Sequence, residues 1–132
     1  MILVDTSIWI DHFNGNSSAK VDQLARALAA TDGTRIFVPG IVLAEILCGL
    51  RSEAEAQRIA QLMDGLERTP QLDTGDYIAA ASIFRTCRSK GEAIRSLVDC
   101  LIAQLCLRHG YRLLSGDRDF TKIARHYPLE LE

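Results

Sequence analysis

The sequence predicts an α/β fold, in which helices cover both faces of a central parallel sheet in three α/β/α layers. Two short apolar runs, Met1–Val4 and Ile36–Val38, and the mostly apolar segment Tyr111–Leu114 indicate the strands of that sheet. Runs without polar alternation are typical of strands buried on both faces. Longer segments with helical periodicity separate these runs, and strands that alternate with helices favour a parallel sheet.

Length and charge limit what the chain can be. Its 132 residues predict a single domain spanning positions 1–132, because a chain of this size buries roughly two-thirds of its unfolded surface. The formal net charge is −2. Such a chain has no overall attraction for nucleic acid, so any contact with one requires a local basic patch or metal ions.

Cysteine usage and hydropathy indicate the cell compartment. The four cysteines form neither a CxxC pair nor a zinc-binding spacing with histidine, so we expect four reduced core thiols in a cytoplasmic protein. The N-terminus lacks the features of a signal peptide. No stretch stays apolar for the roughly 20 residues that a membrane span needs.

The first half of the chain predicts four helices around the second strand. Helix Ser7–Phe13 follows the opening strand, and helix Ala19–Ala30 has Ser18 as its cap. Ile36–Val38 ends at Pro39, a residue that suits the start of a helix. We therefore predict a buried helix over Ile41–Leu50, and then an amphipathic helix over Ser52–Leu66.

The second half predicts an extended segment, three helices and the third strand. Ser96 and Asp99 match a capping box ahead of an apolar helix. Leu129–Leu131 could add a small edge strand. The remaining elements, in order, are an extended Thr69–Leu72, helices Tyr77–Ser89 and Cys100–His109, strand Tyr111–Leu114 and helix Arg118–Ala124.

Four acids fall at one edge of the predicted sheet. Asp5 and Asp117 each follow an apolar strand, and Glu45 lies early in a helix that follows a strand. Asp99 begins the helix that descends to feed the last strand. The carboxyl ends of parallel strands are where ligands bind in open α/β sheets, so we expect these four side chains to converge.

Each acid also has a simpler explanation. Asp5, Asp99 and Asp117 could be helix caps or first-turn acids, and the capping box with Ser96 accounts well for Asp99. Glu45 could pair with an arginine. Asp119 fits a first-turn or supporting acid better than a ligand.

The joint pattern favours a metal. Four carboxylates at one edge would repel one another and raise one another's pKa values. A hard divalent cation such as Mg²⁺ or Mn²⁺ removes that penalty and takes oxygen ligands. Such a site can activate water and stabilise charge on a phosphodiester.

The order of several short motifs resembles a known family. They are Ile2–Ser7, Val42–Glu45, Val98–Ala103, Gly110–Tyr111 and Leu113–Phe120. In this order and spacing they resemble a PIN domain, specifically the VapC-type toxin ribonucleases of type II toxin–antitoxin pairs. The resemblance covers nearly the whole chain.

The resemblance implies a PIN-like fold and Mg²⁺- or Mn²⁺-dependent cleavage of RNA that leaves a 5′-phosphate and a 3′-hydroxyl. It also implies a homodimer, neutralised by a small DNA-binding antitoxin. Gln104 departs from the smaller residue common at its position, which we expect to affect packing. The family's acidic site carries over onto Asp5, Glu45, Asp99 and Asp117, and its supporting positions onto Thr6, Ser115 and Asp119.

We hypothesise that Asp5 and Asp99 are the primary metal ligands and that Asp117 and Glu45 complete the site. Two rival interpretations remain. A receiver-like domain would also bind Mg²⁺ at strand ends and accept a phosphoryl group on an aspartate, but would want a lysine after a late strand. A catalytically inactive PIN-fold interaction module would show no dependence on Mg²⁺.

Other residues are less informative. No catalytic pair involves His12, His109 or His126. The apolar residues Trp9, Ile10 and Phe13, and the stripe of helix Ser52–Leu66, fit core packing or a dimer or antitoxin surface. Candidates for phosphate contact are Arg88, Lys90, Arg95 and Arg118, although a solvated face fits these residues better.

Overall fold

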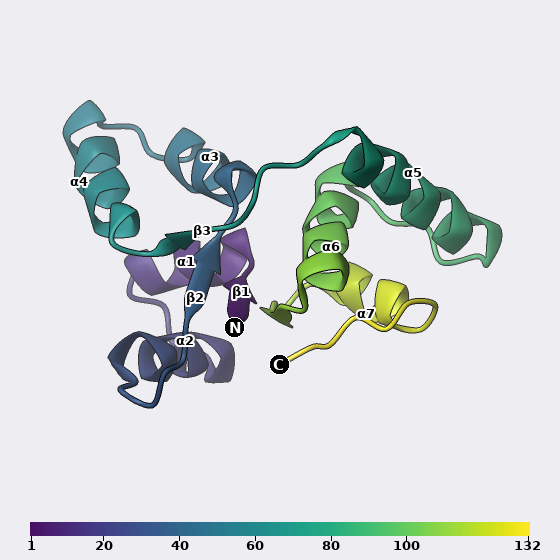
Figure 1. Ribbon diagram of the computed structural model, residues 1–132. Helices are drawn as coiled ribbons and strands as arrows, with labels where there is room; N and C mark the ends of the chain where they lie inside the picture. Colours follow the sequence, from purple (N-terminus) through teal and green to yellow (C-terminus); the bar gives the residue numbers. More distant parts are fainter.

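A four-stranded parallel sheet forms the centre of the computed structural model, which describes all 132 residues (Figure 1). Its strand order is β3-β2-β1-β4, so the first strand along the chain is central. The strands are β1 (Ile2–Val4), β2 (Ile36–Val38), β3 (Glu67–Arg68) and β4 (Arg112–Leu114). Leu3 is completely buried between Phe37 of β2 and Leu113 of β4, as its apolar run predicts.

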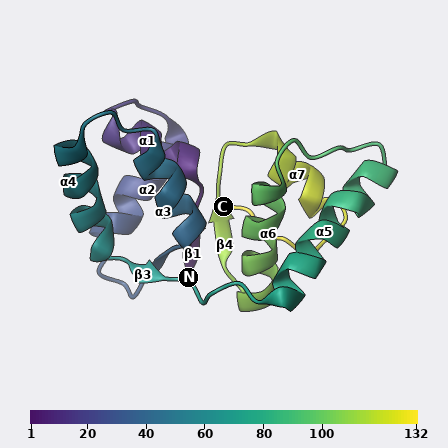
Figure 2. The same cartoon turned by 90° about the horizontal axis from the view of Figure 1, so that it is seen from above.

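Seven helices form the two outer layers. Figure 2 shows α1–α4 gathered on one side of the strands and α5–α7 on the other. This confirms the predicted three-layer α/β/α arrangement. The helices are α1 (Thr6–Phe13), α2 (Ala19–Ala29), α3 (Gly40–Cys48), α4 (Glu53–Asp64), α5 (Thr74–Ser89), α6 (Leu97–His109) and α7 (Arg118–Ala124).

The third strand in sequence, β3, was not predicted. The extended segment expected at Thr69–Leu72 forms no strand, and the chain instead pairs with β2 through Glu67 and Arg68. Because Glu67 and Arg68 are both polar, no apolar run in the sequence indicates this strand. Their pairing is supported by Arg35, whose side chain binds Glu67 beside it. At the other end of the chain, Leu131 makes a single bridge to Leu113 rather than an edge strand.

Two helices, α5 and α6, begin three residues earlier than predicted. Helix α5 begins at Thr74 rather than Tyr77, because Asp73 and Asp76 form a capping box at its N-terminus. Helix α6 begins at Leu97, and the capping box predicted for it does not form. Ser96 accepts a hydrogen bond from the N–H of Val98, which leaves the Asp99 carboxylate free of any capping role.

Burial shows which of the apolar residues with two possible roles, in the core or on a partner surface, belong to the core. Trp9 is 1% exposed and stacks on Phe13, so it belongs to the core. On α4 the buried residues are Ile59 and Met63, whereas Leu62 is exposed. The prediction of four core thiols was wrong for Cys48. All four cysteines are free, but Cys48 is exposed because only one side of α3 is covered.

Candidate active site

The ends of β1 and β4 bring the first functional side chains together. Val4 lies beside Leu114 in the parallel register, so the residues that follow each strand emerge at the same edge. The hydroxyl of Ser115 donates a 2.8 Å hydrogen bond to Oδ2 of Asp5. This contact joins two segments that the sequence analysis predicted to converge.

Asp5 is a buried carboxylate surrounded by donors. Its Oδ1 accepts from the N–H of Thr6 at 2.8 Å, and its Oδ2 accepts from Ser7 as well as from Ser115. Burial raises the pKa of Asp5, these hydrogen bonds lower it in part, and the charge of Asp117 raises it further. Asp5 also caps α1, so the simple explanation and the functional one apply to the same side chain.

Asp99, Asp117 and Asp119 form the tightest acidic group, with one carboxylate oxygen of each lying within 4.8 Å of the others. Asp99 lies in the first turn of α6, whereas Asp117 caps α7 and Asp119 lies in its first turn. Asp5 is outside this group of three.

The charges of all the other candidate acids raise the pKa of the Asp99 carboxyl. Burial raises its pKa to about 7, with further contributions from the charges of Asp5, Asp117, Asp119 and Glu45, in that order. Asp99 accepts no hydrogen bond that would offset this repulsion. A divalent cation is the natural partner for a carboxylate in these surroundings.

Glu45 reaches the site through a hydroxyl rather than an arginine. The Oγ1 atom of Thr6 donates a 2.8 Å hydrogen bond to Oε1 of Glu45, which ties α3 to the start of α1 beside Asp5. Glu45 is half-buried rather than buried as predicted, because only Val42 and Ile46 of its helix are buried. No arginine pairs with it, so that alternative explanation fails.

Asp119 is already compensated by protein groups. It is 1% exposed, and its Oδ2 accepts from the N–H of Arg95 at 2.9 Å and from Arg95 Nε at 3.2 Å. Its Oδ1 lies 3.1 Å from Lys122 Nζ. Burial alone would raise the pKa of Asp119, but these contacts outweigh it and lower the pKa. A supporting role therefore fits Asp119 better than direct ligation.

The donor set suits a hard cation. Asp99 has both carboxylate oxygens free, whereas hydrogen bonds occupy Oδ1 of Asp117 and Oε1 of Glu45 but leave the second oxygen of each unused. Carboxylate oxygens are the ligands that Mg²⁺ and Mn²⁺ prefer, and few protein ligands suffice when water completes the shell. The residues present thus fit the predicted metal.

A cleft of about 910 Å³ opens beside this acidic group. Its walls come from α1, the start of α2, the segment before α6 and α7. They carry three acids, Asp11, Asp117 and Asp119, and four cations, Lys20, Arg95, Arg118 and Lys122. Lys20 and Lys122 were missed by the sequence analysis, because no pattern along the chain brings them together.

The cations of this cleft differ in their partners. Arg95 and Lys122 bind acids, and Lys20 Nζ donates to the main-chain oxygen of Glu132 at 2.7 Å. Arg118 is exposed and makes no hydrogen bond or ion pair. Two other predicted phosphate contacts, Arg88 and Lys90, do not line the cleft, since they lie at the far end of α5.

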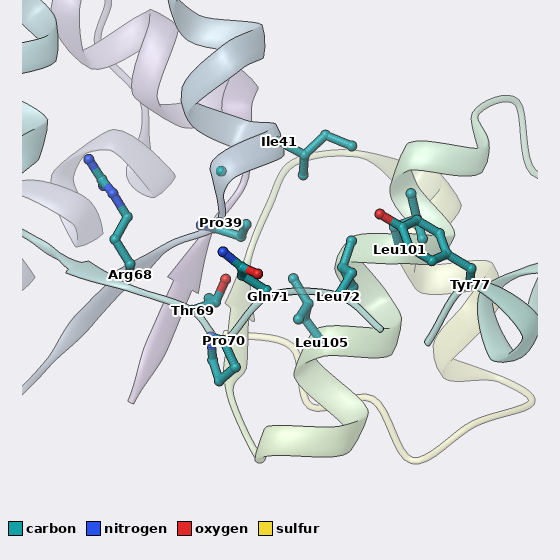
Figure 3. A pocket seen from close by; sticks show the side chains of 11 residues that line it. Pro39, Ile41, Arg68, Thr69, Pro70, Gln71, Leu72, Tyr77, Leu101 and Leu105 are labelled. Atoms are coloured by element: carbon teal, nitrogen blue, oxygen red, sulfur yellow. The ribbon is translucent and has the colours of Figure 1, made fainter. Parts of the chain in front are cut away.

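Figure 3 shows a second pocket, which has a volume of about 560 Å³. It is bounded by the starts of α3 and α5, the segment after β3, and Leu101 and Leu105 of α6. None of the candidate acids lines it. The three histidines have partners other than the candidate acids: His12 contacts Trp9, His109 contacts Tyr111, and His126 contacts Glu92.

Comparison with known proteins decides the family. The model of the PIN domain matches residues 2–126. The VapC ribonuclease Mb1587 of Mycobacterium bovis and ribonuclease VapC11 of Mycobacterium tuberculosis are each 38% identical over 125 residues, which cover 95% of this chain and 92% of the relative. The chain belongs to the PIN-domain family, among the VapC ribonucleases.

Solved PIN-domain structures share the fold. VapBC2 from Rickettsia felis, bound to a DNA fragment from its promoter, matches with a TM-score of 0.73 at 22% identity, covering 100% of this chain and 98% of that one. VapBC-1 from nontypeable Haemophilus influenzae matches with a TM-score of 0.75 at 18% identity, covering 100% and 97%. Among the helices of this PIN domain, none has the length and apolar character needed to cross a membrane.

Proposed function

We propose that this protein is a Mg²⁺- or Mn²⁺-dependent endoribonuclease that acts in the cytoplasm as the toxin of a toxin–antitoxin pair. The observation that carries the proposal is the position of Asp99: a carboxylate without hydrogen bonds, whose pKa is raised to about 7 by burial and by four other acids. Membership among the VapC ribonucleases supports RNA as the substrate.

The residues have separate roles in this proposal. Asp99 and Asp5 are the main ligands, and Asp117 and Glu45 complete the site through their free oxygens or through water. Ser115 orients Asp5, and Thr6 orients Glu45. A divalent cation held there would activate water for attack on the phosphodiester and stabilise the charge that develops on it.

The cleft beside the acids is the proposed path of the RNA backbone. Arg118 has no acidic partner, so it is free to bind a phosphate next to the scissile bond. Local cations of this kind would overcome the unfavourable net charge of −2, together with the metal itself.

The decisive experiment measures cleavage of purified RNA by the full chain in the presence of Mn²⁺. We expect EDTA to stop cleavage, and we expect Asp99→Asn and Asp5→Asn to abolish it while circular dichroism shows an unchanged fold. Arg88→Ala serves as the matched control, because it removes a charged side chain far from the cleft. Full activity of either Asn variant would refute the proposal.

A small DNA-binding antitoxin and a second copy of the chain are the proposed protein partners. The structural neighbours VapBC2 and VapBC-1 support the first of these partners. Exposed apolar side chains that a partner could cover include Ile10 on α1, Leu62 on α4 and Ile78 on α5. Sedimentation of the purified chain at micromolar concentration tests the homodimer, and a monomeric mass would contradict it.

A further inference from the structure

We propose that Arg95 is a positioning residue, which clamps Asp117 and Asp119 together and thereby fixes the geometry of the acids for a divalent cation. The inference rests on the proposed metal-dependent function. It goes further by giving a role to a side chain that the sequence analysis named only as a candidate for phosphate contact.

The contacts of Arg95 form a two-acid fork. Its Nη2 donates to Oδ1 of Asp117 at 2.9 Å, and its Nε donates to Oδ2 of Asp119 at 3.2 Å. The main-chain N–H of Arg95 donates to the same Oδ2 at 2.9 Å. A planar guanidinium can serve two carboxylates in a fixed arrangement, which an ammonium cannot do.

The fork fixes which oxygen of Asp117 is available. Oδ1 accepts from Arg95 and also from the N–H of Asp119, at 2.9 Å. Two donors on one oxygen hold the carboxylate in one orientation and leave Oδ2 free, in the acidic group that includes Asp99. Without Arg95, a single main-chain bond would hold Asp117, and its carboxylate could rotate.

The fork also connects the two segments that carry the acids. Arg95 lies just before α6, the helix of Asp99, and its partners lie at the start of α7. Lys122 braces the same junction, since its Nζ contacts Asp119 and donates to the main-chain oxygen of Ala93 at 3.1 Å. Asp119 therefore acts as a buried anchor through which α7 holds the start of α6.

Charge alone predicts the opposite effect on metal binding. A guanidinium beside Asp117 repels a cation, so a purely electrostatic Arg95 would weaken metal binding, and its removal would strengthen it. The Arg95 side chain is 74% exposed, however, and its charge is largely screened by solvent. Geometry should dominate, because Mg²⁺ demands near-ideal placement of its ligands.

The test is calorimetric titration of the metal-free full chain with Mn²⁺, without RNA. We expect Arg95→Ala to weaken Mn²⁺ binding by about tenfold, the lower end of the loss seen when a residue supporting a metal ligand is removed. Arg95→Lys keeps the charge but not the fork, so we expect most of the same loss. Unchanged or tighter binding by Arg95→Ala would overturn the proposal.

The matched control is Arg118→Ala. It removes one positive charge from the same cleft but breaks no contact with an acid, so we expect its Mn²⁺ affinity to stay within about twofold, or to tighten slightly through the lost charge. A loss equal to that of Arg95→Ala would mean that cleft charge, not the fork, governs the metal, and would also overturn the clamp.

Folding and function are read separately. Thermal unfolding of each variant shows whether the fold persists, and Arg95→Lys provides the same comparison if the alanine variant is unfolded. If the unaltered chain cleaves RNA and binds Mn²⁺ but Arg95→Ala binds it equally well, only the clamp fails. If the unaltered chain binds no Mn²⁺, the proposed function fails first, and the clamp fails with it.

Discussion

Ser115 and Asp5, which lie 110 positions apart in the sequence, are joined by a 2.8 Å hydrogen bond across the ends of β4 and β1. The bond is possible because the two strands are parallel neighbours in register. It favours the charged form of a buried carboxylate at the edge where the other acids gather. Of the groups that lower the pKa of Asp5, Ser115 is the strongest.

Removing this hydroxyl should weaken the site without unfolding the chain. In Ser115→Ala, Oδ2 of Asp5 keeps only the longer contact with Ser7, so the charged form is less favoured. We expect Mn²⁺ affinity to fall by about tenfold. Calorimetric titration measures this, with Ser115→Thr as the variant that keeps the hydroxyl. Equal affinity of Ser115→Ala and the unaltered protein would contradict the role.

Metal binding should depend on pH through Asp99. The pKa of this carboxyl is about 7 without metal, so below pH 7 a cation must displace a proton from it. We expect Mn²⁺ affinity to rise by roughly tenfold per pH unit below 7 and to level off above it. Titrations in buffers with different ionisation enthalpies count the released protons. A flat profile between pH 5.5 and 7 would exclude Asp99 as the proton source.

The parts of the site that follow apolar strands were predictable from the sequence. Asp5 comes directly after a buried strand, and Asp117 follows another after Ser115 and Gly116. Parallel strands end at one edge, so the convergence of the two acids follows from the fold class. Glu45 was placed at the same edge, but its partner Thr6 was not inferred, because an arginine was the only partner considered for it. The Asp99 carboxylate takes no part in capping α6, because Ser96 caps the helix through the N–H of Val98. The capping-box motif in the sequence did not predict this.

Other parts lay beyond sequence reasoning. The strand at Glu67 and Arg68 is polar and only two residues long, so it is specified by its neighbours rather than by its own pattern. The cleft cations come from segments far apart in the chain, and only the folded arrangement of α2, α7 and the segment before α6 brings them to one cleft. The fork of Arg95 was also beyond sequence reasoning, because its three contacts join the segment before α6 to the start of α7.

Arg108 should matter for stability rather than for catalysis. It binds Asp76, which is 1% exposed, and Gln104 donates to the same carboxylate at 3.2 Å, so this departure from the family pattern makes a specific hydrogen bond. We expect Arg108→Ala to lower the free energy of unfolding at pH 7, because it removes the cationic partner of the buried Asp76 carboxylate. Chemical denaturation measures the loss, and Arg112→Ala, which breaks the surface pair with Glu132, is the control.

The Asp76 cluster also gives the protein an acid limit. The N–H of Asp73 is the main cause that lowers the pKa of Asp76 to about 2, and Gln104 and Arg108 add to it, against the opposing effect of burial. A depressed carboxyl pKa stabilises the fold above the unfolded value near 3.8 and loses that contribution as pH falls toward 2. In Arg108→Ala this loss between pH 4 and 2 should be smaller, which denaturation across that range can measure.

Asp99 should have the opposite effect, destabilising the metal-free fold. Its folded pKa of about 7 lies above the model value of 3.8, so between these values the native state holds the proton more tightly than the unfolded chain. Stability from this group is therefore greatest below pH 3.8 and declines as pH rises to 7. Replacing a repelled carboxylate by a neutral amide removes the penalty.

We accordingly expect Asp99→Asn to stabilise the metal-free protein at pH 8 by about 2 to 4 kcal/mol while abolishing RNA cleavage. Thermal unfolding in EDTA at pH 8 and pH 4 measures the effect, which should nearly vanish at the lower pH. Saturating Mn²⁺ should reverse the order, because only the unaltered site gains from the cation. If Asp99→Asn is less stable than the unaltered protein in EDTA at pH 8, then Asp99 supports the fold. In that case the metal does not act by relieving repulsion among the acids.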